Sequence, residues 1–261
     1  QVLKKSIKSI LIIYFLSIFL IQNTYSAEDG VEPLNVDWTF KGFFGKFDRG
    51  SLQRGYQVYN EVCASCHSMK YLSYRNLAEE GGPEFSKEQA KAIAANFEVI
   101  DGPNDDGDMF TRAAKLSDKF VGPYQNDKEA MASNGGAYPP DFSVLVKARS
   151  GGADYIYSLL LGYEDPPSNV ILDDGVYYNK YMYGNMIRMP NPLSDGLIEY
   201  NDGTEATEEQ MAKDLVNFLA WAAEPHLEAR HKIGFKAIIY LLILTILVYF
   251  SMKRLWSRVE P

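Results

Sequence analysis

The sequence predicts a mainly α-helical fold with long loop insertions and one transmembrane helix near the C-terminus. Apolar side chains recur at helical spacing in several segments, and segments rich in glycine, proline and tyrosine separate them. The third observation is an apolar stretch from Ile233 to Met252, in which Lys236 is the only charged residue. About 20 such residues are long enough to cross a bilayer. The hydrophobic content of 46% is that of a globular protein.

In chain order, the pattern predicts an aromatic-rich segment over residues 27–50, followed by five helices. The first helix is capped by Ser51 and runs to about Val62. The last soluble helix begins at a Thr-x-x-Gln capping box at Thr207 and ends before Pro225. We expect this last helix to pack across the first. The predicted helices cover residues 51–62, 86–98, 141–148, 154–161 and 207–224, and long loops are expected over residues 101–141 and 162–203.

Both ends of the chain predict export and membrane anchorage. A basic start, a short apolar run and small residues at Thr24 and Ser26 are typical of a signal peptide that is cleaved after Ser26; an uncleaved anchor is the alternative. Lys253, Arg254 and Arg258 follow the apolar stretch, so the positive-inside rule assigns this end to the cytoplasm. The predicted parts are a signal peptide (residues 1–26), an exported domain (27–231), a transmembrane anchor (232–252) and a cytoplasmic tail (253–261).

The sequence Cys-Ala-Ser-Cys-His at residues 63–67 is the attachment signature of a c-type haem. Cys63 and Cys66 can bond to the two vinyl groups of one haem, and His67 can then bind the iron. A structural zinc site needs about four ligands, whereas the chain has 2 cysteines and 3 histidines. A thioredoxin-like pair would need a βαβ context, which the sequence does not indicate. Covalent haem attachment outside the bacterial cytoplasm agrees with the predicted export.

A methionine is the best candidate for the second axial ligand, because the other two histidines lie beside the anchor and a thioether raises the reduction potential. Met182, Met186 and Met189 cluster in one Pro/Gly-rich loop. The run Met-Pro-Asn-Pro makes Met189 the most rigidly held of the three, with Met186 as the runner-up. Met109 and Met131, in the central loops, also stay open.

Further motifs run from about residue 36 to the anchor. They are Arg54-Gly55-Tyr56-Gln57-Val58-Tyr59, Asp101-Gly102-Pro103-Asn104, Asn134-Gly135 with Pro139-Pro140-Asp141, Gly151-Gly152-Ala153-Asp154-Tyr155 and Trp221-Ala222-Ala223-Glu224-Pro225. Together with the haem signature, this set resembles the cytochrome c1 family, the haem subunits of ubiquinol–cytochrome c reductase (bc1) complexes. The combination is far more specific than the haem signature alone.

The resemblance implies a c-type cytochrome fold and a set of haem contacts. The residues that it assigns are Cys63 and Cys66 as thioether links, His67 and Met189 as iron ligands, and Arg149 and Tyr155 as neighbours of the haem, with Arg149 on a propionate. The family has a small residue before the ligand methionine and Ala-Pro-Pro after it. Here Arg188 precedes Met189 and Pro-Asn-Pro follows, so Met186 stays the alternative ligand.

The resemblance also implies a function: an electron carrier that takes electrons from the Rieske iron–sulfur protein and passes them to cytochrome c, with cytochrome b as a further partner. The expected location is the bacterial inner membrane, with the haem domain in the periplasm. The net charge is −8, and basic residues concentrate at the chain ends, so the exported domain is acidic and disfavours nucleic acid. Two alternatives stay open: a membrane-tethered mono-haem shuttle of another respiratory complex, and a haem sensor or enzyme with an open iron position.

Overall fold

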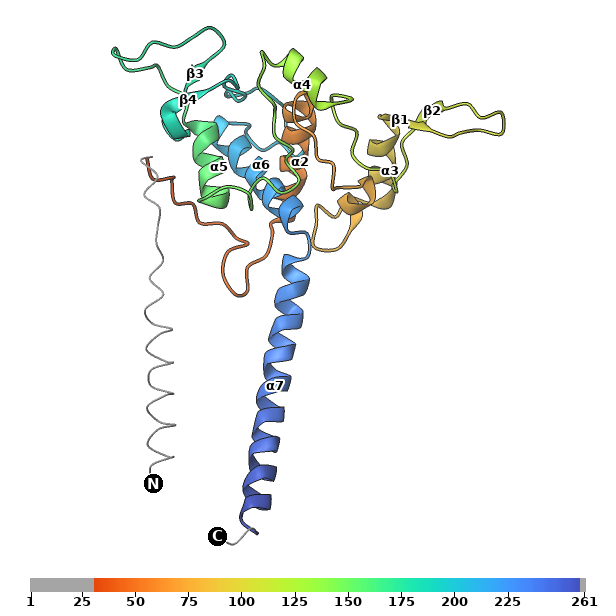
Figure 1. Ribbon diagram of the computed structural model, residues 1–261, viewed down its shortest axis with the longest axis vertical. Coiled ribbons are helices and arrows are strands. Elements are labelled where there is room, and N and C mark those ends of the chain that lie inside the picture. Colours follow the sequence, from red (N-terminus) through yellow and green to blue (C-terminus); the bar gives the residue numbers. More distant parts are fainter. Residues whose placement is uncertain (1–30, 259–261) are drawn as a thin grey trace. The chain divides into compact units, whose positions relative to one another are not determined.

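Helices dominate residues 31–258, the part of the chain that the computed structural model describes (Figure 1). The helices are α2 (Arg49–Glu61), α3 (Lys87–Ala95), α4 (Asp127–Ser133), α5 (Gly152–Leu161), α6 (Glu208–Ala223) and α7 (Leu227–Trp256), with short 3-10 turns η1 (Cys63–Ser65), η2 (Tyr74–Ala78) and η3 (Tyr183–Asn185). The strands form two antiparallel pairs: β1 (Glu98–Asp101) with β2 (Phe110–Ala113), and β3 (Tyr177–Tyr178) with β4 (Met186–Ile187). The mainly α-helical prediction is confirmed. The predicted signal peptide lies outside the described residues.

Helix α2 begins before the predicted start, because Asp48 rather than Ser51 caps it. The Asp48 carboxylate accepts a hydrogen bond from the Ser51 amide at 2.8 Å, which satisfies one of the free donors of the first turn. Ser51 is buried, and its hydroxyl donates to Asp214 of α6 at 2.6 Å. Leu52 and Tyr56 lie on the predicted apolar face and are buried.

Helix α2 packs directly against α6, as expected for the first and last soluble helices. A Cβ at Gly55 would lie 2.1 Å from the Asp214 carbonyl oxygen and 2.7 Å from Phe218 Cβ, so only glycine permits this approach. The rings of Tyr56 and Tyr59 pack against Phe218 with centroids 5.7 and 5.9 Å apart. The crossing therefore forms the centre of the core.

The capping signals of two helices have different outcomes. Ser86 and Gln89 complete a capping box at the start of α3, with reciprocal hydrogen bonds of 2.8 and 3.1 Å. Thr207 accepts a hydrogen bond from the Gln210 amide at 3.1 Å. The Gln210 side chain, however, donates to Asp214 at 2.9 Å, so half of the predicted box at α6 is formed.

The secondary structure between residues 86 and 148 differs from the prediction: elements form inside an expected loop, and one expected helix is absent. Helix α3 ends at Ala95, and strand β1 begins at Glu98, inside the predicted helix of residues 86–98. Strand β2 and helix α4 occupy part of the expected loop. The predicted helix over residues 141–148 is wrong, since consecutive turns are formed there. The Asp141 carboxylate is bonded to other segments of the chain, as described below.

Helix α7 is the single C-terminal membrane helix of residues 31–258, and the predicted anchor over residues 232–252 lies inside it. Its most apolar window has a mean hydropathy of 2.3, and none of that window is buried against the domain. The apolar side chains of α7 are therefore available to lipid.

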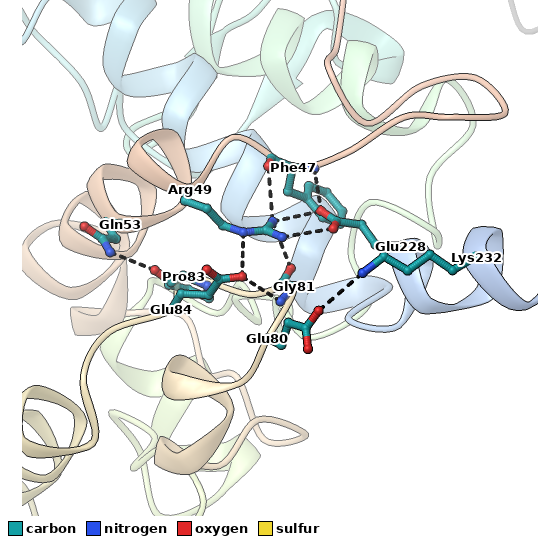
Figure 2. Close-up of polar contacts among 9 residues, drawn as sticks. All are labelled: Phe47, Arg49, Gln53, Glu80, Gly81, Pro83, Glu84, Glu228 and Lys232. Carbon is teal, nitrogen blue, oxygen red and sulfur yellow. Dashed lines mark hydrogen bonds and ion pairs between the residues drawn. The ribbon is translucent and has the colours of Figure 1, made fainter.

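The first turn of α7 is fastened to the domain through one arginine (Figure 2). Both guanidinium Nη atoms of Arg49 donate to the Glu228 carboxylate, at 2.8 and 2.9 Å, and the Phe47 amide donates to the same carboxylate at 3.0 Å. Arg49 also donates to Glu84 at 2.8 Å and to the Gly81 carbonyl at 3.2 Å. The start of α2, the start of α7 and the loop at residues 81–84 thus meet at this arginine.

Candidate functional site

Helix α2 delivers the cysteines and the histidine that the sequence predicts to hold a haem. Directly after α2, the Cys63 carbonyl accepts hydrogen bonds from the amides of Cys66 at 3.1 Å and His67 at 2.8 Å. This tight turn joins the backbone of all three residues in one unit. Cys63 is buried and Cys66 is partly exposed, and both thiols are free.

The state of the thiols fits thioether formation. Burial raises the pKa of Cys63 to about 12, and the neighbouring Cys66 sulfur adds to the rise, so the thiol is protonated at neutral pH. The Cys63 and Cys66 sulfurs would hold a haem through thioether bonds to its two vinyl groups. Between residues 31 and 258 there is no group of three or more His, Cys, Asp or Glu side chains that could hold a metal ion.

His67 is buried and oriented as an iron ligand would be. Its Nδ1 lies 2.9 Å from the Pro140 carbonyl oxygen. Because a carbonyl can only accept, Nδ1 carries the proton and Nε2 is left with the lone pair that binds a metal. The imidazole stacks on Phe142 with centroids 4.0 Å apart. Burial lowers the pKa of His67, against the opposing effects of Pro140 and Asp141, which favours the neutral form that coordination needs.

Asp141 connects the segment after the haem motif to the segment that carries the Pro140 carbonyl. Its carboxylate accepts hydrogen bonds from the Ser68 hydroxyl at 2.7 Å, the Lys70 amide at 2.9 Å and the Ser143 amide at 2.8 Å. Burial alone would raise the pKa of Asp141, but these hydrogen bonds outweigh it and hold the pKa below its ordinary value. The ionised carboxylate therefore positions the carbonyl that orients His67.

Met189 and Met186 differ in their surroundings. Met186 is on strand β4, paired with Tyr178, and its side chain is 52% exposed. Met189 follows that strand, is half-buried, and its carbonyl accepts a hydrogen bond of 3.0 Å from the Tyr163 hydroxyl. Arg188, between them, is exposed and donates to the Gly135 carbonyl at 3.3 Å. Of the two candidates, Met189 is the less exposed.

Arg149 and Tyr155, the other two residues that the sequence resemblance assigned, lie on either side of the start of α5. Arg149 is exposed in the preceding turn, where it donates to the Ala148 carbonyl at 3.2 Å. Tyr155 is half-buried on α5, and its hydroxyl lies 3.6 Å from the sulfur of Met182. Tyr155 thus links α5 to the methionine-rich loop.

Sequence reasoning missed three partners of the histidine. The Pro140 carbonyl and the Phe142 ring contact the imidazole, and the Tyr59 hydroxyl donates to the His67 carbonyl at 3.1 Å. The sequence marked residues 139–141 as a turn and a helix cap. The one available signal was the inclusion of Pro139-Pro140-Asp141 among the family motifs.

The site and the fold together define a class of protein. The site has two free thiols followed by an imidazole that a backbone carbonyl orients, and the helical domain carries a membrane helix. These are the features of membrane-anchored c-type cytochromes. Comparison with known proteins narrows the class. The Cytochrome C1 family matches residues 38–259, nearly the whole of the described chain. The chain belongs to the cytochrome c1 family, and a c-type haem at Cys63, Cys66 and His67 follows from that membership.

Known relatives agree over most of the chain. Mitochondrial cytochrome c1 2 of Arabidopsis thaliana is 49% identical over 243 residues, which cover 93% of this chain and 78% of the relative. Cytochrome c1 of Rhodospirillum rubrum is 46% identical, covering 89% of this chain and 90% of the relative. Cytochrome b/c1 of Bradyrhizobium diazoefficiens is 46% identical; the match covers 91% of this chain but 37% of that longer protein.

Proposed function

We propose that this chain is the haem-bearing electron-transfer subunit of a cytochrome bc1 complex, and that it passes electrons from the Rieske iron–sulfur protein to cytochrome c. The observation that carries the proposal is the His67 imidazole, buried and held by the Pro140 carbonyl at 2.9 Å directly after two free cysteines. When bound, the haem iron supplies one-electron redox chemistry. The protein itself holds, orients and shields that group.

Each proposed contact has a separate physical role. Cys63 and Cys66 would attach the haem through thioethers, and His67 Nε2 and the Met189 sulfur would bind its iron. A thioether ligand favours the reduced metal and therefore raises the reduction potential. Arg149, exposed before α5, offers a guanidinium to a propionate. Tyr155 holds the wall formed by α5 against the methionine-rich loop.

The proposed topology is that of an exported, anchored domain in a bacterial inner membrane. Residues 1–26 serve as the signal peptide, residues 27–231 form the periplasmic haem domain, residues 232–252 cross the membrane, and residues 253–261 are cytoplasmic. The exposed apolar surface of α7 and the basic residues that follow it support this arrangement.

The proposed partners are cytochrome b, the Rieske protein and a cytochrome c acceptor. The printed name of the Bradyrhizobium relative, cytochrome b/c1, supports an association with cytochrome b. The acidic exported domain favours a basic cytochrome c, whose approach would be steered electrostatically. The rate of electron transfer to such an acceptor should fall as salt rises, because screening shortens the Debye length to about 8 Å at physiological ionic strength.

The attachment test replaces both thiols. Cys63→Ala/Cys66→Ala should lose the haem when the protein is denatured and extracted with acidified organic solvent, whereas the wild-type protein should keep it. Haem that remained with the denatured double variant would place the covalent bond elsewhere. Each single variant should keep one thioether, which a pyridine haemochrome spectrum detects.

The ligand test compares two neighbouring methionines. Met189→Leu should lower the midpoint potential and open the reduced iron to carbon monoxide, whereas the matched control Met186→Leu should change neither. Exchanged results would make Met186 the ligand. Carbon monoxide binding to the reduced wild-type protein would instead favour the sensor or enzyme alternative. Purification without cytochrome b would favour the shuttle of another complex.

A further inference from the structure

A loop with an exposed aromatic tip lies between two buried anchors in the N-terminal part of the domain. We call residues 38–47 the aromatic loop. Its ends, Trp38 and Phe47, are 3% and 5% exposed, whereas Phe43 and Phe44 at its tip are 55% and 75% exposed. Apolar side chains are ordinarily buried when a protein folds, because contact with water is unfavourable. Two adjacent exposed phenylalanines therefore indicate a partner outside the domain.

The conformation of the aromatic loop is fixed by its backbone. The Lys46 amide donates to the Thr39 carbonyl at 2.9 Å, and the Gly45 amide donates to the Gly42 carbonyl at 3.2 Å. A Cβ at Gly45 would lie 2.2 Å from the Phe40 carbonyl oxygen, so the tight return of the chain requires glycine. The backbone contacts therefore hold the tip of the loop in one conformation.

The aromatic loop is joined to the membrane helix α7 in two ways. The rings of Phe43 and Phe44 contact Phe235 of α7, with centroids 6.4 and 6.1 Å away, and contact each other at 5.0 Å. At the base of the loop, the Phe47 amide donates to Glu228 in the first turn of α7 (Figure 2). The position of the tip along α7 is set by these contacts.

That position is the edge of the hydrocarbon layer. Lys236 follows Phe235, and Lys253 lies at the other end of the apolar stretch; at 1.5 Å per residue they are about 25 Å apart along the axis. A bilayer core is about 30 Å thick, and lysine side chains at its edges extend to the headgroups. Phe235 thus lies at this boundary, and the tip of the aromatic loop lies beside it.

The charges around the tip match a lipid surface. A groove of about 180 Å³ runs between the loop and the helix, lined by Phe44, Lys46, Lys232 and Phe235 among others. The Glu228 carboxylate at its edge is bonded to Arg49, and Lys232 lies 3.3 Å from the exposed Glu80 carboxylate. An apolar surface with Lys46 at its rim suits acyl chains below and phosphate groups above.

We propose that the aromatic loop inserts Phe43 and Phe44 into the headgroup–acyl boundary of the bilayer, so that the domain contacts lipid at a second point beside α7. The occupant of this surface is lipid because the tip is continuous with the lipid-facing surface of α7 and lies at the level of its first apolar turn. A second copy of this chain or the helix of another subunit would cover the same rings from the side.

The test measures the depth of the tip in the full-length holoprotein reconstituted into vesicles of phosphatidylcholine and phosphatidylglycerol. A nitroxide is attached to Phe44→Cys, and collisions with dioxygen, which concentrates in the bilayer, are compared with those of a water-soluble nickel chelate. Ile171→Cys, at a loop position that is 93% exposed, is the matched control, and wild-type protein gives the labelling background. The haem spectrum of each variant reports that it is folded.

At residue 44 dioxygen should collide several-fold more often than the nickel chelate, and at residue 171 the order should be reversed. Phe43→Cys should repeat the result at residue 44. Equal nickel access at residues 44 and 171 would put the loop in water and overturn the proposal. Exclusion of both reagents from residue 44 would show that protein covers it, which would also overturn the proposal.

Discussion

Arg54 offers a test of what holds the crossing of α2 and α6 together, since it pairs with two aspartates of different exposure. Its Nε donates to Asp214 at 2.8 Å and its Nη1 donates to Asp202 at 2.8 Å. The Asp214 side chain is 1% exposed and that of Asp202 is 47% exposed. Asp214 also accepts hydrogen bonds from Ser51 and Gln210. The hydrogen bond between Arg54 and Asp214 is the main cause that raises the pKa of Arg54.

The substitution Asp214→Asn keeps the size of the side chain but removes the charge that faces a largely buried guanidinium. Breaking a buried pair costs roughly 3–5 kcal/mol, whereas an exposed pair contributes at most about 1 kcal/mol. For a domain of this size, 1 kcal/mol shifts the melting temperature by about 2–4 °C. Asp214→Asn should therefore lower it by roughly 6–20 °C, and the matched control Asp202→Asn by no more than about 4 °C.

The assay is thermal unfolding of the detergent-solubilised holoprotein, followed by far-ultraviolet circular dichroism and by the haem absorption. Both signals should show the larger shift for Asp214→Asn. Equal shifts for the two variants would refute the reasoning, because burial would then not distinguish the two pairs. A shift below about 2 °C for Asp214→Asn would mean that the crossing depends on the aromatic contacts alone.

Three further changes test other parts of the fold. Burial alone would raise the pKa of Asp154, but its lysine, indole and amide partners outweigh burial and lower it. The ionised carboxylate therefore stabilises the fold above about pH 4, and this stabilisation is lost as pH falls through the folded-state pKa. Amide exchange of residues 31–41, relative to the intrinsic rate at each pH, should rise in acid, and Asp154→Asn should abolish that rise. Gly55→Ala would put a Cβ 2.1 Å from the Asp214 carbonyl, and haem staining of membranes should show little assembled protein. Glu228→Gln removes one of the two carboxylates that pair with Arg49, and proteolysis between the domain and α7 should become faster.

Each of these has an outcome that contradicts it. Acid-induced exchange that persisted in the Asp154 variant would assign the pH dependence to another group. Normal haem content in the Gly55 variant would mean that the two helices separate without loss of folding. An unchanged proteolysis rate in the Glu228 variant would mean that the remaining hydrogen bonds hold α7, and Lys46→Gln serves as its surface control.

The sequence predicted the parts of the site that are local and missed those that depend on distant contacts. The haem motif and its helix lie within a few residues, so spacing alone identified Cys63, Cys66 and His67. The carbonyl that orients His67 is 73 residues away in the chain, and the partner of Arg49 in α7 is 179 residues away. Neither pairing leaves a local pattern in the sequence.

The errors in secondary structure have similar causes. The helix predicted from Asp141 is not formed, although its carboxylate accepts the Ser143 amide as a cap would; the same carboxylate is also bonded to Ser68 and Lys70, and turns follow. Ser51 was a reasonable cap by residue type, but burial against Asp214 uses its hydroxyl elsewhere. In both places the side chain that local reasoning had assigned to a helix end makes a tertiary contact that the sequence does not indicate.

Helix α2 also acts as a spacer between the membrane helix and the redox centre. Its first residue, Arg49, is tied to the first turn of α7, and Cys63 follows its last turn. Its 13 residues give it a length of about 20 Å, and a helix of this kind does not stretch. The distance from the anchor to the haem attachment point is therefore set by a residue count, and one added turn would lengthen it by about 5 Å.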